Sequence, residues 1–174
     1  IEGPRVYLGG DNAITRCCVP HLGLPLAKVA VLTFDAHLDV RNLDKGDHNG
    51  NPIRGLVEAG LPGENVVQVG LLPFANSKAY VHFARERGLR GVTVAQVRER
   101  GIAPIVQEVL ADFARRGLTV YVDLDVDVLD AAFTPGTPGA RPGGLFPDEV
   151  ATAAYLCGVN PSVMAMDLVE IDPR

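Results

Sequence analysis

The sequence predicts an α/β fold in which a mainly parallel sheet carries helices on both faces. Short apolar runs rich in Val alternate with stretches of helical periodicity, a pattern typical of such sheets. Polar side chains gather at the C-terminal ends of the apolar runs, where ligands bind in open α/β sheets. No internal repeat or linker interrupts residues 1–174. We therefore expect a single domain.

The strands follow from the apolar runs. In chain order they are "RVYLGG" (5–10), "KVAVLTFDAH" (28–37), "NVVQVGLL" (65–72), "GVTV" (91–94), "LTVYVDLDVDVL" (118–129) and "SVMAMDLVEI" (162–171). The first strand leads into Asp11 and Asn12, and the second carries Asp35 and His37. We expect these two strands to lie side by side.

Helical patterns fall between the strands, for example at 77–88 and 102–117. In the second of these, apolar residues recur at near-helical spacing and Gly117 provides a C-terminal stop. The repeating apolar residues are Ile105, Val109, Leu110 and Phe113.

Composition excludes several classes of protein. The 174 residues suffice for a substantial core, and the net charge of −5 without a Lys/Arg-rich run argues against nucleic-acid binding. No apolar run reaches the roughly 20 residues that span a bilayer. Three cysteines without a CxxC pair favour a reducing, cytoplasmic compartment. The chain begins just before an expected strand and without Met, and it ends just after another, so we expect a fragment that lacks N- and C-terminal elements of a longer domain.

The stretch "FDAHLDV" carries Asp35, His37 and Asp39 at a spacing of two residues. On an extended chain such side chains point to one side. Two carboxylates and an imidazole suit a divalent cation, and the oxygen content favours Mn²⁺ or Mg²⁺ over a structural Zn²⁺. The alternative is a polar strand end that caps the next helix, with His37 satisfied by a neighbour.

The stretch "VYVDLDVDVLD" contains Asp123, Asp125 and Asp127, which alternate with apolar residues. We therefore expect all three on one face of a strand. Two carboxylates about 4 Å apart repel by about 4 kcal/mol at an effective dielectric constant near 20, so a buried row needs cations, protonation or a wet cleft. The alternative is an edge strand with a solvated acidic face.

Three chemistries could use this row of carboxylates. An EF-hand is excluded, because the positions that require Gly and Glu hold Val128 and Thr134. A phosphatase of the haloacid-dehalogenase type would use Asp125 as nucleophile and Asp127 as general acid with Mg²⁺, but its motif normally opens the domain. The third chemistry joins both acidic stretches around two cations roughly 3.5–4 Å apart, with a bridging hydroxide that attacks an amidine or guanidine carbon.

Five segments carry a resemblance to a known family. They read "GGDNAIT" (9–15), "FDAHLDVR" (34–41), "HNGNPIR" (48–54), "DVDVLDAAFTPGTPGARPGG" (125–144) and "MDLVEIDP" (166–173). In this order they resemble the arginase/agmatinase/formimidoylglutamase (ureohydrolase) family, and five motifs together are far more specific than any one. The resemblance implies an arginase-like three-layer α/β/α fold, a binuclear Mn²⁺ hydrolase of C–N bonds, and a homo-oligomer, either a trimer or a hexamer.

The resemblance also implies roles for the matching residues. Asp35 and Asp125 would bridge two Mn²⁺ ions, Asp39 would complete one site, and His37 with Asp127 would complete the other. The implied ligand set, which includes the position after "GGD", is Asn12, Asp35, His37, Asp39, Asp125 and Asp127.

Two substitutions depart from the family's usual pattern. Members usually carry a metal-binding His where this chain has Asn12, so we expect that ion to be held more loosely. Arginases and agmatinases carry a proton-shuttling His where this chain has Asn49, with His48 one place earlier. Glu170 would hydrogen-bond the amidine or guanidine nitrogens. The catalytic candidates are thus Glu170, His48 and Asn49.

The substitutions resemble formimidoylglutamase-like members, which read GGDN and xNGTP. Arg141 stands where agmatinases tend to carry an acid, and a cation there favours a substrate with carboxylates. Arg41 and Arg54 are further candidates for carboxylate binding, and the alternative for Arg141 is a solvent-facing loop residue. The leading hypothesis is therefore hydrolysis of N-formimidoyl-L-glutamate to L-glutamate and formamide. The other hypotheses are a guanidino-compound ureohydrolase that releases urea, with His48 as proton shuttle, and a non-catalytic family member.

Overall fold

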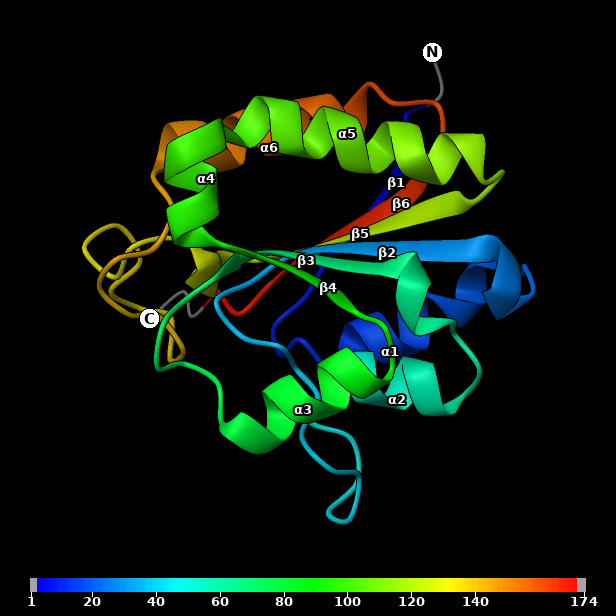
Figure 1. Cartoon of the computed structure of the whole chain (residues 1–174), viewed down its shortest axis with the longest axis horizontal. Helices are drawn as coiled ribbons and strands as arrows, with labels where there is room; N and C mark the ends of the chain where they lie inside the picture. Colours follow the sequence, from blue (N-terminus) through cyan, green and yellow to red (C-terminus); the bar gives the residue numbers. More distant parts are fainter. Residues whose placement is uncertain (1–2, 172–174) are drawn as a thin grey trace.

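Six parallel strands form one sheet in the computed structural model, which describes residues 3–171 (Figure 1). Their order across the sheet is β1-β6-β5-β2-β3-β4. The strands are β1 (Arg5–Leu8), β2 (Val29–Phe34), β3 (Val66–Leu71), β4 (Arg90–Thr93), β5 (Thr119–Asp125) and β6 (Val163–Val169). This arrangement confirms the predicted parallel α/β fold.

Helices cover both faces of the sheet, which gives three layers (Figure 1). One face carries α4 (Val94–Arg100), α5 (Ile102–Arg115) and α6 (Pro147–Gly158), and the other carries α1 (Ile14–Cys18), α2 (Pro52–Glu58) and α3 (Lys78–Glu86). Within residues 3–171, no helix has the length and apolar character needed to cross a membrane.

Each face of the sheet has its own apolar core. Side chains of β2 alternate between the two cores: Leu32 and Phe34 pack against α5, whereas Val29 and Val31 join the cluster beneath α1 and α2. Burial of this apolar surface on both faces is the main force that stabilises such a sheet. The predicted helix at 102–117 is confirmed, because its four repeating apolar residues are buried and Gly117 follows it with a φ of 65°.

Two expectations about the strands are wrong. β1 lies beside β6 and not beside β2, since β6 and β5 both insert between them. The strands also end earlier than the apolar runs predict: β2 ends at Phe34 and β5 at Asp125. Apolar residues therefore continue past the last ladder hydrogen bond, into loops that are themselves buried. The short helices α1 and α2 span 5 and 7 residues, too few for a periodic pattern to reveal them.

The order of the strands creates a switch point between β2 and β5. From β2 the chain proceeds through β3 to β4 on one side, whereas from β5 it proceeds to β6 on the other. At such a point the loops that follow the neighbouring strands separate and leave a crevice at their carboxyl ends. The acidic residues of this chain follow β2 and β5, so they converge there.

Candidate metal centre

A cleft of about 200 Å³ opens at the carboxyl ends of β2, β5 and β6. Most of the predicted site residues line it: His37, Asp39, Arg41, Asn49, Asp125, Asp127, Arg141 and Glu170. Asn12 and Asp35 lie behind this lining and are buried, with exposed fractions of 0% and 1%. Loops after four different strands thus contribute to one site.

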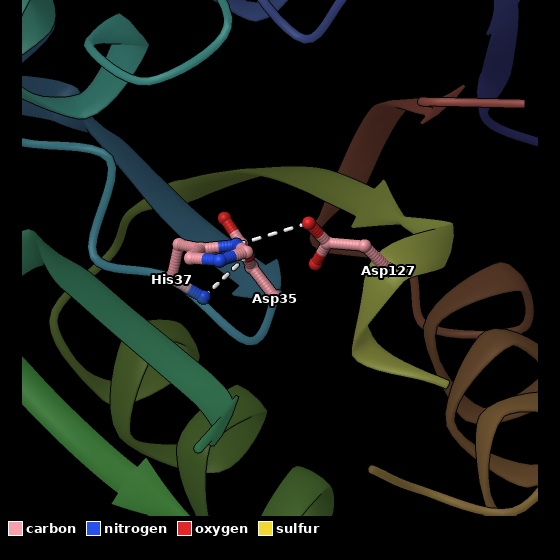
Figure 2. A group of neighbouring side chains, drawn as sticks. All are labelled: Asp35, His37 and Asp127. Atoms are coloured by element: carbon pink, nitrogen blue, oxygen red, sulfur yellow. Dashed lines mark hydrogen bonds and ion pairs between the residues drawn. The ribbon is translucent and has the colours of Figure 1, made fainter. Parts of the chain in front are cut away.

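Asp35, His37 and Asp127 form a first group of ligand candidates (Figure 2). Their ligand atoms lie within 4.8 Å of one another. The Nδ1 atom of His37 lies 2.9 Å from Oδ2 of Asp127 and 3.3 Å from Oδ1 of Asp35. Two carboxylates and an imidazole at this spacing can hold one divalent cation.

Short turns, and not extended strands, bring these side chains together. The main-chain N–H of His37 donates to Oδ1 of Asp35 at 2.6 Å, just after β2 ends. The main-chain N–H of Asp127 donates in the same way to Oδ1 of Asp125 at 2.8 Å, within a 3-10 turn (Val126–Val128). Each aspartate therefore folds the chain back on itself and aims the residue two positions later into the cleft.

These turns correct two predictions. The side chains from Asp35 to Asp39 do not lie on an extended chain, and Asp127 does not share a strand face with Asp123 and Asp125. The convergence of the acids was expected, but its local geometry was not.

Asn12, Asp39 and Asp125 form a second group. The Nδ2 atom of Asn12 lies 2.9 Å from Oδ2 of Asp39 and 3.3 Å from Oδ2 of Asp125, so the amide sits between two carboxylates. This contact spans separate strands, because β1 is two strands away from β5. The predicted ligand residues thus lie in two adjacent groups at one edge of the sheet.

Two residues that contact Asn12 have strained backbones. Asp39 has a φ of 50° and Glu170 a φ of 62°, in the left-handed region that residues other than glycine seldom adopt. The main-chain N–H of Asn12 donates to Oε1 of Glu170 at 2.8 Å, and the amide of Asn12 contacts Asp39. Strain of this kind persists where the surroundings dictate the backbone, and it clusters at functional sites.

The first group carries unusual proton affinities. Burial raises the pKa of Asp35 to about 7, although the hydrogen bond from His37 partly offsets this. Burial opposes the charged form of His37, but hydrogen bonds to Asp127 and Asp35 outweigh it and raise the pKa of the imidazole to about 10. In the second group, burial and then the charge of Asp35 raise the pKa of Asp39 and of Asp125.

These pKa shifts have one physical origin, which is an excess of carboxylates in a poorly solvated cleft. Protons relieve the repulsion by binding to the carboxylates. A divalent cation relieves it by binding to the same oxygen lone pairs in place of the protons, and oxygen donors with one imidazole suit Mn²⁺ or Mg²⁺. The residues present therefore suit a divalent cation.

The loop after β5 closes one wall of the cleft. Asp130 accepts hydrogen bonds from the N–H groups of Ala132 at 2.9 Å and Gly143 at 2.6 Å, and it thereby holds this loop together. Gly139 lies so close to the candidate metal ligands that a Cβ there would collide with Oδ2 of Asp127. The loop thus packs directly on Asp127.

The rim of the cleft holds an acid, an amide and two arginines. Oε2 of Glu170 lies 3.4 Å from Nδ2 of Asn49. Arg41 and Arg141 are exposed at the mouth. The Arg41 side chain packs directly over the main chain of Gly50. A Cβ at Gly50 would collide with it, at 2.7 Å from Cδ and 2.8 Å from Nε.

Two predicted residues are placed elsewhere. Arg54 pairs with Glu58 at 2.8 Å and stacks on Phe83, with 4.5 Å from Cζ to the ring centroid. It therefore joins α2 to α3, and the structure does not support its prediction as a substrate ligand. His48 accepts a hydrogen bond from the N–H of Gly50 at 3.0 Å within its own turn, and it does not line the cleft.

A buried polar cluster behind Asn12 was missed. Oδ2 of Asp167 lies 2.6 Å from the hydroxyls of both Thr15 and Tyr121. Asp123 lies opposite Asp167 in the neighbouring strand, and neither of its carboxylate oxygens has a hydrogen-bond partner among the described residues. The available signal was an aspartate inside an otherwise apolar strand, which requires a polar partner.

Comparisons with known proteins identify the family of this chain. The model of the arginase family matches residues 3–174. A formimidoylglutamase of Bacillus subtilis is 36% identical over 170 residues, which are 97% of this chain and 53% of that protein. A mitochondrial guanidino acid hydrolase of Homo sapiens is 31% identical over 170 residues, or 95% of this chain and 47% of that protein.

Solved structures of the same kind of enzyme share the fold of this chain. The crystal structure of the Bacillus subtilis formimidoylglutamase superposes with a TM-score of 0.90 and covers 97% of this chain and 53% of its own. A Trypanosoma cruzi formiminoglutamase, solved with Mn²⁺, superposes with a TM-score of 0.87 at 26% identity, over 97% of this chain and 57% of its own. The chain spans about half the length of these relatives. The family model, the relatives and the fold agree, and the chain belongs to the arginase family.

Proposed function

We propose that this chain is part of a hydrolase that cleaves a C–N bond of a linear amidine, with N-formimidoyl-L-glutamate as the first candidate substrate. The products would be L-glutamate and formamide. One observation carries the proposal: a buried acidic ligand set shares a cleft with two arginines at its mouth, Arg41 and Arg141. The acids suit cations, and the arginines suit a substrate that carries carboxylates.

The proposed cofactor is a pair of Mn²⁺ ions. His37 and Asp127 would hold one ion, Asp39 and Asn12 the other, and Asp35 and Asp125 would lie between them. A cation pair of this kind lowers the pKa of water towards neutrality and polarises the bond under attack. His37 must be neutral to serve as a ligand, so its proton leaves as the ion binds.

Glu170 would orient the reacting group. Its Oε1 is engaged by the N–H of Asn12, whereas Oε2 faces the cleft beside Asn49. Oε2 accepts from Nδ2 of Asn49 at 3.4 Å, and its second lone pair can accept a hydrogen bond from an amidine nitrogen. The hydrogen bond from Asn12 to Oε1 fixes the orientation of the carboxylate before substrate binds. Little conformational entropy of the Glu170 side chain is then lost when Oε2 binds the substrate.

The two arginines would recognise the glutamate part of the substrate. A guanidinium group binds a carboxylate through two parallel hydrogen bonds. Arg41 and Arg141 approach the cleft from different loops, which suits a substrate with two carboxylates. A dicationic substrate such as agmatine would be repelled by the same pair.

Asn49, at the position of the family's shuttle, has an amide that neither gains nor loses a proton near neutral pH. We propose that Asn49 positions Glu170 and the substrate.

A panel of substrates tests the proposal. With Mn²⁺ supplied, the full chain should turn over formimidoylglutamate with a higher kcat/KM than arginine, agmatine or guanidinobutyrate. Formimidoylglutamate hydrolysis should release formamide and glutamate in equal amounts. Turnover of agmatine alone would overturn the choice of substrate and leave the family unchanged.

A guanidino acid is the second candidate, because Arg41 and Arg141 would fit its carboxylate equally well and a human relative is named for that activity. Release of urea in the same panel would identify it. The non-catalytic alternative predicts that no metal survives dialysis, whereas two Mn per chain would exclude it. Assembly into a trimer or hexamer is also a proposal, to be checked by light scattering.

A further inference from the structure

The hydroxyl of Thr15 has one proton and two close acceptors. It lies 2.9 Å from Oδ1 of Asn12 and 2.6 Å from Oδ2 of Asp167. Tyr121 also donates to Oδ2 of Asp167, at 2.6 Å. Thr15 and Asn12 are both fully buried. A single proton cannot satisfy both acceptors, so the cluster is mismatched while the amide oxygen of Asn12 points at Thr15.

Rotation of the Asn12 amide by half a turn removes the mismatch. Its Nδ2 would then donate to the Thr15 hydroxyl, and the Thr15 proton would go to Asp167. Its Oδ1 would occupy the place that Nδ2 now holds, which is between Asp39 and Asp125. An amide oxygen there faces a cation favourably, whereas an amide N–H does not.

We infer that Thr15 is a positioning residue that presents the oxygen of Asn12 to the cation held by Asp39 and Asp125. This inference rests on the proposed cation pair. A hydroxyl can donate or accept, so Thr15 pairs with the amide in either orientation, and its link to Asp167 favours the orientation that ligates. An amide ligand in place of histidine would thus depend on a partner behind it.

The test measures Mn²⁺ affinity, and no substrate is needed. Mn²⁺ is added stepwise to the metal-free full chain, and the concentration of free Mn²⁺ is measured by electron paramagnetic resonance. Thr15→Val, which keeps the shape and removes the hydroxyl, should weaken the looser of the two ions by about 10-fold or more, as loss of a ligand's hydrogen-bond partner typically does. Thr15→Ser should restore the affinity to within a few-fold of the original.

Thr33 provides the matched control. It is also a fully buried threonine, but its hydroxyl has no hydrogen-bond partner among residues 3–171. Thr33→Val should leave both Mn²⁺ affinities unchanged. An equal loss in Thr33→Val and Thr15→Val would show that packing, and not the hydroxyl, matters, and would overturn the inference.

A double-mutant cycle shows whether Thr15 acts through Asn12. In an Asn12→Ala background, Thr15→Val should have no further effect on Mn²⁺ affinity. A persistent effect there, or unchanged affinity in Thr15→Val alone, would overturn the inference and leave the proposed function intact. Two tightly bound Mn²⁺ ions without amidine hydrolysis would overturn the proposed function and leave the inference intact.

Discussion

The main-chain N–H of Asn12 donates to Oε1 of Glu170 at 2.8 Å, which ties the loop after β1 to the residue that follows β6. The same asparagine reaches Asp39 and Asp125 through its side chain. One residue therefore links the acid proposed to hold the substrate to the acids proposed to hold a metal. Replacement of Asn12 would remove its side-chain contacts with Asp39 and Asp125.

Replacement of Glu170 by Gln separates these two roles. Gln keeps an oxygen that accepts from Asn12, but it puts an NH₂ group where an amidine nitrogen should donate. We expect kcat/KM for formimidoylglutamate to fall by about 10²–10³-fold with the Mn content unchanged. Glu58→Gln, on the outer face of α2, is the control. Loss of Mn together with activity would assign Glu170 to the metal site instead.

Arg41 is expected to act on binding. Arg41→Gln should raise KM for formimidoylglutamate by about 10–100-fold, the usual loss of a hydrogen bond to a charged group, with a small effect on kcat. Arg54→Gln is the matched control, because that arginine pairs with Glu58 away from the cleft. Equal KM values for Arg41→Gln and the original protein would remove Arg41 from the substrate site.

His48 distinguishes the two candidate reactions. Under the amidine proposal, His48→Ala removes only a turn acceptor, and the rate should fall less than 10-fold. If His48 shuttles a proton for a guanidino substrate, the rate should fall by about 10²–10⁴-fold. The comparison uses steady-state rates and thermal midpoints, with His82→Ala as a control at an exposed histidine on α3.

The stability of the metal-free chain should fall as the pH rises from about 6 to about 9. The pKa of Asp35 is about 7 in the folded chain against an ordinary 3.8, so the native state binds more protons and loses stability until Asp35 is ionised. The pKa of His37 is about 10 against 6.5, so its stabilising contribution is complete below 6.5 and is lost as the pH rises through 10. Both effects have the same sign.

Thermal unfolding with EDTA and with Mn²⁺ measures this effect. The gap between the two midpoints should widen with pH, because Mn²⁺ replaces the protons that the cluster loses. Asp35→Asn should flatten the pH dependence of the metal-free protein. A metal-free midpoint that climbs over the same range would contradict the proposed charge state.

The convergence of the acidic residues was predictable from the sequence, because charged side chains are unusual inside apolar runs and require polar partners there. The residues that stand out in this way are Asp35, His37, Asp125 and Asp127. Their convergence followed from the rule that parallel strands end at one edge. Arg54 was predicted to bind substrate, but residue type alone does not show where a side chain points. In the structure its guanidinium group pairs with Glu58 and stacks on Phe83.

The sequence by itself determined the α/β alternation, the cluster of acidic residues at the strand ends and the family motifs, because periodicity and residue chemistry are local properties. Only the tertiary structure decided that β1 lies two strands away from β5 and still brings Asn12 to Asp125. It alone placed Thr15 and Asp167 behind that asparagine. Strand order and buried hydrogen bonds depend on how distant segments pack, and no local pattern in the chain encodes that.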